Sequence, residues 1–202
     1  MKFDFQLPVI AMVLMICCLL FPLLQNIHFP LLDGMTVTAV ELVQALLLLS
    51  FGVFSFFYIS PFKLEVGQKQ FWLWSIAWWI LLFGRSISWG RDYFPETPKV
   101  YFRLISIVVI SPVVFMLFSK YLRKELRNKF KTAQLQFWGV LLVVIGLMVS
   151  DAVEHHRALG GLFLYDAAYK DLIEEMYEFP LIISLFLISF PLMKKDRNAY
   201  KH

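Results

Sequence analysis

Two short clusters of carboxylate and imidazole groups are the part of the sequence best suited to chemistry. Asp151, Glu154 and His155 stand at positions i, i+3 and i+4, so they share one face of a helix. Glu174 and Glu178 stand four residues apart and share a face in the same way. Helical bundles build metal sites from such clusters on neighbouring helices. We therefore predict a divalent metal site, for example for zinc, with the ligands Asp151, Glu154, His155 and Glu178.

A carboxylate beside such a metal would act as the general base for a metal-bound water. Glu41 and Glu174 are the residues that we predict for this catalytic role. Glu41 lies near the start of an apolar segment and shares a helix face with Thr38 and Gln44. Two alternatives stay open: Glu41 and Glu174 are helix-start acids stabilised by the helix dipole, and His155 is an interfacial histidine without a ligand role.

Three arginines and a serine form a second candidate site. A guanidinium group makes forked contacts with carboxylates and phosphates, and Arg85 shares a helix face with Ser88. We predict that an anionic headgroup is bound by Arg85, Ser88, Arg91 and Arg103. The alternative is that these arginines neutralise acidic residues on the same side of a membrane.

Composition determines which elements must position these residues. The chain is 59% hydrophobic and contains 21 Phe and 6 Trp among 202 residues, which is typical of an integral membrane protein. A spanning helix needs about 20 mostly apolar residues, and the alternating pattern of a membrane β-barrel is absent. We predict an all-α protein, a single bundle over residues 1–202 with six transmembrane helices at about 7–24, 37–59, 71–87, 104–119, 135–153 and 176–193.

The distribution of basic residues predicts the orientation, because loops rich in Lys and Arg stay in the cytoplasm. With the N-terminus inside, 13 of the 19 Lys and Arg residues fall on the inner side. We therefore expect both termini in the cytoplasm, in a multi-pass protein of the inner membrane. The predicted site residues then gather near the extracytoplasmic leaflet. The basic run at 120–131 lies inside, where we expect it to meet anionic lipid headgroups and not nucleic acid.

Two stretches of the sequence resemble a pattern found in a group of uncharacterised bacterial multi-pass membrane proteins. Residues 87–91 (ISWGR) and 94–98 (FPETP) are similar to its acidic pair, I-S-W-G-Q-R, aromatic residue and E-T-P. An upstream Asp-Gly and Glu, and a later E-E-x-x-E, resemble Asp33-Gly34, Glu41 and residues 174–178. The chain has Arg85-Ser86 where the group has its acidic pair. The resemblance implies the architecture and the location of the site, and it implies no reaction.

Three classes of function follow from these observations. In the first, the charged site binds a lipid, an anionic headgroup, a protein partner or a second copy of the chain. In the second, the protein is a metal-assisted hydrolase or transferase that acts on a lipid-type substrate in the membrane. In the third, it is a proton-coupled transporter in which Glu41 and Glu178 titrate.

Overall fold

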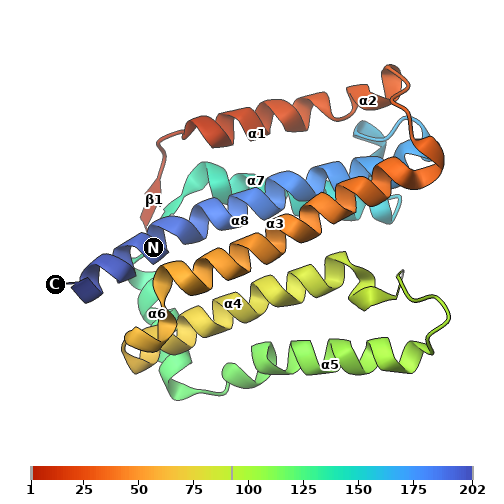
Figure 1. Cartoon of the computed structure of the whole chain (residues 1–202). Coiled ribbons are helices and arrows are strands. Elements are labelled where there is room, and N and C mark those ends of the chain that lie inside the picture. Colours follow the sequence, from red (N-terminus) through yellow and green to blue (C-terminus); the bar gives the residue numbers. More distant parts are fainter. Residues whose placement is uncertain (1, 92, 202) are drawn as a thin grey trace. The chain divides into compact units, whose positions relative to one another are not determined.

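The protein is built almost entirely of helices. The computed structural model describes residues 2–91 and 93–201, and Figure 1 shows the elements of this part of the chain. It contains eight α-helices and a small sheet of two paired strands, β1 and β2. Their bounds are β1 Lys2–Asp4, α1 Val9–Leu20, α2 Leu23–Asn26, α3 Met35–Ile59, α4 Val66–Ser86, α5 Lys99–Met116, α6 Lys120–Thr132, β2 Gln134–Gln136, α7 Phe137–Glu154 and α8 Lys170–Lys201.

Four of these helices are long and apolar enough to cross a membrane. They are α3, α5, α7 and α8, of which α3 and α8 lie in the longer candidate spans Leu32–Lys63 and Ala167–Ala199. The other two expected spans fall on α1 and α4. The helix α1 is apolar but has only 12 residues. The helix α4 has 21 residues, but it is less apolar than α3, α5 and α7 because its first turns carry polar side chains such as Lys69.

Each of the six predicted apolar stretches coincides with a helix, although the bounds differ at several ends. The helix α8 begins at Lys170, ahead of the predicted start at 176, so the acidic residues of this region belong to the helix itself. The helix α5 contains Pro112 within its 18 residues. The main element that the sequence analysis missed is α6, which forms a helix where a loop was expected.

The chain divides into two compact units. The first consists of Met1–Lys2, Ala45–Ala133 and Phe190–His202, and the second of Phe3–Gln44 and Gln134–Ser189. In the first unit, α4 packs against both α5 and α6. Buried Trp72 and Trp79 of α4 supply much of its core, and Phe51 meets Trp79 edge-on with ring centroids 5.6 Å apart. A β-carbon on Gly52 would lie 3.2 Å from that of Trp79, so glycine lets the two helices approach closely.

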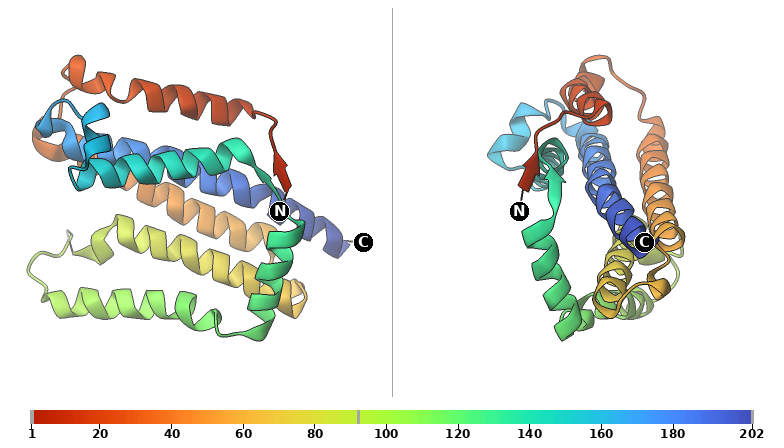
Figure 2. Two further views of the ribbon diagram at one scale, coloured as in Figure 1. Left: turned by 180° about the vertical axis from the view of Figure 1, so that it is seen from behind. Right: turned by 90° about the vertical axis from the view of Figure 1, so that its left-hand side faces the viewer.

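Within the first unit, α6 lies crosswise to α4 and α5 (Figure 2). Its inward residues follow the spacing of one helix face, which is what an amphipathic helix requires. They are Leu122, Glu125, Leu126, Lys129 and the following Ala133. Leu122 is completely buried, and a β-carbon on Gly67 of α4 would lie 3.6 Å from that of Glu125. The first turn of α4 therefore packs directly against α6.

The second unit has its own apolar core, formed by α1, α7 and the part of α8 up to Ser189. Buried members of this core include Leu14 of α1, Leu142 and Val149 of α7, and Ile173 and Tyr177 of α8. The Tyr177 hydroxyl donates a hydrogen bond of 2.6 Å to the backbone carbonyl of Cys18. This bond satisfies a polar group in an apolar core, where an unpaired hydroxyl is costly.

Glycines of α7 allow close contact with α8 within the second unit. A β-carbon on Gly146 would lie 2.8 Å from the carbonyl oxygen of Tyr177 and 2.9 Å from the β-carbon of Leu181. A β-carbon on Gly139, two turns earlier, would lie 3.1 Å from Ile188 Cγ1. Small residues at this spacing let helix backbones approach, as is common between membrane helices.

Candidate functional site

The predicted site residues divide between the two units. Arg85, Ser88, Arg91 and Arg103 all belong to the first unit, whereas Glu41, Asp151, Glu154, His155, Glu174 and Glu178 belong to the second.

Asp151, Glu154 and His155 lie at the end of α7 in the arrangement that their spacing predicts. The His155 Nδ1 atom is 3.5 Å from an Asp151 carboxylate oxygen and 3.6 Å from a Glu154 carboxylate oxygen. The sequence analysis did not predict the partner of Asp151, which is Arg157. Its two terminal nitrogens each lie 3.1 Å from one carboxylate oxygen, so the contact is a forked ion pair. The Arg157 side chain is largely exposed and the Asp151 side chain is partly exposed.

The turn after α7 folds back onto the end of that helix. The Arg157 backbone N–H donates a 2.9 Å hydrogen bond to the carbonyl of Ala152. Residues Ala158–Leu162 then form a 3₁₀ turn, η4. A β-carbon on Gly160 would lie 2.6 Å from the Ala152 carbonyl oxygen, so only glycine fits there. His156, just before the turn, has a φ of 51°, a left-handed conformation that is uncommon for residues other than glycine.

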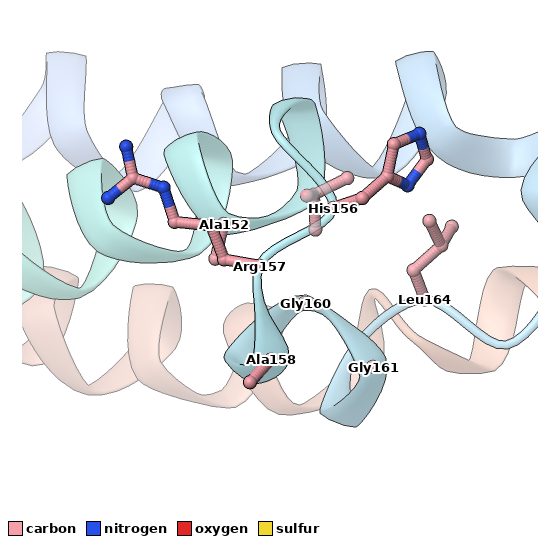
Figure 3. A pocket seen from close by; sticks show the side chains of 8 residues that line it. Ala152, His156, Arg157, Ala158, Gly160, Gly161 and Leu164 are labelled. Atoms are coloured by element: carbon pink, nitrogen blue, oxygen red, sulfur yellow. The ribbon is translucent and has the colours of Figure 1, made fainter.

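This turn and the end of α7 line a partly open pocket of about 280 Å³. Its lining residues are Ala152, Val153, His156, Arg157, Ala158, Gly160, Gly161 and Leu164. Figure 3 shows the side chains of His156 and Arg157 leaving the turn in opposite directions, with Leu164 on the side of His156. The pocket is thus small, mostly apolar and bordered by two groups that can carry positive charge.

Gln25 of α2 ties the segment between α7 and α8 to the rest of the second unit. Its amide nitrogen donates a 2.8 Å hydrogen bond to the carbonyl of Phe163, and its amide oxygen accepts from the backbone N–H groups of Tyr165 and Asp166 at 2.7 and 2.9 Å. The Gln25 side chain is buried. This glutamine was not singled out in the sequence, where an isolated Gln after an apolar helix carries no specific signal.

The acidic residues of α8 lie close to acidic residues of other elements of the second unit. The Glu174 carboxylate repels those of Glu154 and Glu178 electrostatically, and the Glu175 carboxylate repels those of Glu178 and Glu41. Glu41, Glu174, Glu175 and Glu178 are all half-buried. Gln44, one turn after Glu41, donates a 2.7 Å hydrogen bond to the Glu175 carbonyl. The unit therefore gathers carboxylates from α3, α7 and α8.

The predicted metal ligands do not form a recognisable coordination site. Within residues 2–91 and 93–201, no group of three or more His, Cys, Asp or Glu side chains is placed to hold a metal ion. Asp151, Glu154 and His155 lie together, but Asp151 is engaged by Arg157. Glu178 is half-buried in α8. A zinc site with these four ligands is therefore a prediction that the arrangement of the described side chains does not support. The catalytic role of Glu41 and Glu174 stays a prediction.

In the first unit, the predicted arginines lie at the end where α4 leads into α5. Arg85 is in the last turn of α4, Arg103 is in the second turn of α5, and Arg91 belongs to the segment that connects the two helices. Figure 1 shows α4 and α5 as neighbouring helices joined by this connection. All three arginine side chains are exposed, and Ser88 is half-buried. The helices α4 and α5 and their connection thus form a helical hairpin, and the predicted anion-binding residues lie at its connected end.

The connection has a tightly constrained turn. Ser88 and Trp89 both have positive φ values, 48° and 58°, within the 3₁₀ turn η3, Ser88–Gly90. A β-carbon on Gly84 would lie 2.7 Å from Cε3 of the Trp89 ring, so the indole packs directly on the backbone of the last turn of α4. Such strained backbone persists only where its surroundings hold it. The turn therefore has a defined shape next to Arg85 and Arg91.

The first unit also contains a buried polar cluster that the sequence analysis missed. The Asp196 carboxylate accepts a 2.8 Å hydrogen bond from the Trp72 indole nitrogen, and both of its oxygens accept from the Lys129 ammonium group. Lys129 also lies 3.6 Å from Glu125 and 5.6 Å from the centre of the Phe71 ring. Asp196 follows two lysines in the sequence, so it resembles an ordinary solvated charge. The only available signal was a Lys that falls on the apolar face of a helical pattern.

Comparison with known proteins does not assign the chain to a family: no family model, curated protein or solved structure matches it. The structure is that of a helical protein with four candidate membrane-spanning helices. Several such helices are expected of a multi-pass membrane protein.

Proposed function

We propose that this chain is a six-span protein of the inner membrane, with both termini in the cytoplasm, that binds an anionic lipid headgroup at its extracytoplasmic end. The binding residues are Arg85, Ser88, Arg91 and Arg103. The observation that carries this proposal is the exposure of three arginines at the joined ends of α4 and α5. The proposed spans are α1, α3, α4, α5, α7 and α8.

The chemistry of the hairpin end fits a phosphate group. A guanidinium group presents several N–H donors in a fixed plane and makes forked hydrogen bonds to phosphate. Trp89 lies between Arg85 and Arg91 in the sequence, and indole rings are enriched at the level of lipid headgroups. Because Trp89 is packed on Gly84, the turn presents its arginines from a defined backbone. A phospholipid would satisfy both the arginines, through its phosphate, and the indole ring, through the adjoining acyl chains.

The topology is tested first, because the site must face the extracytoplasmic leaflet. A reporter fused after residue 201 or inserted near Arg127 should read cytoplasmic. One inserted near Glu96 or Asp166 should read external. The reason is the excess of Lys and Arg on the proposed inner side. A reporter near Glu96 that reads cytoplasmic would place Arg85 and Arg91 at the other leaflet and contradict the proposed site.

The binding residues are tested by native mass spectrometry of the purified full chain with phosphatidylglycerol or phosphatidylcholine. The variant Arg85→Gln/Arg103→Gln should bind phosphatidylglycerol at least about tenfold more weakly, because each lost charged hydrogen bond is worth about 1.5–3 kcal/mol. The matched control Arg157→Gln/Lys170→Gln removes two cations from the same proposed side. It should leave binding unchanged.

The variant Arg85→Lys/Arg103→Lys separates charge from geometry. It keeps both positive charges but removes the forked donors, so we expect binding between that of the wild type and that of the Gln variant. Equal phosphatidylglycerol binding by the wild type and the Gln variant would contradict the proposed role of the arginines. Equal losses in the Gln variant and its control would show a general charge effect instead of a site.

A second candidate function, proton-coupled transport, is favoured by the carboxylates gathered in the second unit. Glu41, Glu174, Glu175 and Glu178 interact electrostatically, and acidic groups within membrane segments often belong to proton relays. The test is proton uptake into proteoliposomes that enclose a pH-sensitive dye. Uptake that is present in the wild type and lost in Glu178→Gln would favour this function, and equal traces for protein-containing and empty vesicles would exclude it.

A further inference from the structure

The helix α6 separates its charged residues between two opposite faces. Leu122, Leu126 and Lys129 are directed inward, toward the packed interior of the first unit. The exposed side chains include five cations and no acidic residue, because the acidic Glu125 belongs to the inward face. The exposed cations are Lys120, Arg123, Lys124, Arg127 and Lys131.

Two aromatic side chains border this cationic face. With about 100° between successive residues of a helix, Tyr121 and Phe130 fall on its two flanks, between the cations and the inward residues. They are 60% and 62% exposed. Just before α6, Phe115 and Phe118 are also exposed, at the end of the candidate span α5. Cations with flanking exposed aromatic rings are typical of helices that lie at a membrane surface.

The rotation of α6 about its own axis is held by the cluster around Asp196. Lys129 projects from the face opposite to the exposed cations and reaches the buried Asp196 carboxylate of α8. The Trp72 indole nitrogen holds the same carboxylate from α4 at 2.8 Å. Turning α6 would bring Lys129 out of this cluster and leave a buried carboxylate without its cation, which is strongly unfavourable. The cluster therefore fixes which side of α6 faces outward.

The placement of α6 matches a membrane surface. It lies crosswise to α4 and α5 (Figure 2), so it runs along the membrane plane if these helices cross the membrane. It also starts shortly after α5 ends at Met116, so the end of a candidate span brings it to the headgroup level. The cationic face complements the negative surface of a leaflet that contains anionic lipids.

We propose that the exposed face of α6 binds the phosphate groups of anionic phospholipids in the adjacent leaflet, and that Asp196 is a positioning residue that holds this face toward them. This surface lies at the opposite end of α4 from Arg85 and is independent of the headgroup site proposed there. Lipid is favoured over an acidic protein because the aromatic flanks and the neighbouring end of α5 are apolar and exposed.

The experiment is a thermal unfolding titration of the purified full chain in detergent micelles that contain added phosphatidylglycerol or phosphatidylcholine. A ligand that binds the folded state raises the melting temperature, so phosphatidylglycerol should raise it and phosphatidylcholine should not. Both variants are made in the Arg85→Gln/Arg103→Gln background, which removes the other proposed phosphatidylglycerol site. In Lys120→Gln/Lys124→Gln, the concentration for half of the maximal rise should increase at least about tenfold. The matched control Lys194→Gln/Lys195→Gln removes two exposed lysines of α8 in the same unit, and it should behave as the background chain does.

Asp196→Asn tests the positioning role. If the role of Asp196 is purely structural, this variant should have a lower melting temperature without lipid and an unchanged half-maximal phosphatidylglycerol concentration. A positioning role also raises that concentration, although Asp196 is buried and does not contact lipid.

Three results would overturn the proposal. An unchanged half-maximal concentration in Lys120→Gln/Lys124→Gln would show that the α6 face is not the binding surface. An equal increase of this concentration in the variant and its control would show that lipid binding depends only on net charge. Stabilisation by polyglutamate but not by phosphatidylglycerol assigns the face to an acidic protein partner. An unchanged concentration in Asp196→Asn removes the positioning role.

Discussion

The indole nitrogen of Trp72 donates a 2.8 Å hydrogen bond to the carboxylate of Asp196, which lies 124 residues further along the chain. The same carboxylate receives the ammonium group of Lys129 from α6. A single buried acid therefore connects α4, α6 and α8 within the first unit. Replacing either charged partner alone leaves the other without compensation in a site from which water is largely excluded.

Asp196→Leu should therefore destabilise the protein by about 3–5 kcal/mol, whereas Lys129→Met/Asp196→Leu should recover most of this loss. The side chains of Lys129 and Asp196 are only 12% and 6% exposed, so solvent screens their interaction weakly. Unfolding of the purified protein by a denaturant, followed through tryptophan fluorescence, measures the difference. A double variant as unstable as the sum of the two single variants would show that the two charges are not energetically coupled.

Gly160→Ala should destabilise the second unit by about 1–3 kcal/mol, the usual cost of forcing an added group into a packed site. Its new β-carbon would lie 2.6 Å from the Ala152 carbonyl oxygen. Gly161→Ala is the matched control, because nothing lies within 4 Å of a β-carbon there. The melting temperatures of the two variants give the comparison. Equal values would mean that the turn after α7 relaxes without cost.

Gln25→Leu should cost about 1–3 kcal/mol, because it leaves the Phe163 carbonyl and the N–H groups of Tyr165 and Asp166 without their partner. The variant should also make the segment between α7 and α8 more susceptible to limited proteolysis. Asn26→Leu changes the neighbouring, exposed amide and serves as the control. Similar cleavage rates in the wild type and Gln25→Leu would argue against a role of Gln25 in holding this segment.

Arg157→Gln, in contrast, should change the free energy of unfolding by less than about 1 kcal/mol, although it removes a forked ion pair with Asp151. The Arg157 and Asp151 side chains are 62% and 41% exposed, so water and salt compensate for most of the lost attraction. Chemical unfolding at low and high salt tests this prediction. A large loss that disappears at high salt would show that the pair is stronger than its exposure indicates.

The sequence predicted the apolar helices well because their signal is local. Continuous runs of Leu, Ile, Val and Phe indicate helices without any knowledge of their neighbours, and all six predicted stretches coincide with helices. Six membrane crossings and the single bundle stay predictions, as does the likeness to the bacterial membrane proteins. The polar helix α6 was missed because its sequence is dominated by charges. Its few apolar residues form a buried face only because α4 packs against them.

The polar contacts of the site were harder to predict because they depend on tertiary structure. Helical spacing correctly placed Asp151, Glu154 and His155 together, since that relation lies within one helix. The partner of Asp151 was not predicted, because Arg157 reaches it only through the backward turn of the chain after α7. The bonds between Gln25 and Phe163 and between Trp72 and Asp196 span more than a hundred residues, and no periodicity in the sequence encodes such distances.

Gly146 sets the direction in which the end of α7 presents its charged residues. Because a β-carbon on Gly146 would lie 2.8 Å from the Tyr177 carbonyl oxygen, the close contact of α7 with this part of α8 requires that the glycine side of α7 faces it. Asp151 follows five residues later, which turns it by about 140° from the contact line in a regular helix. A side chain at position 146 would act as a wedge that turns the helix. It would redirect Asp151 and His155 without touching either of them.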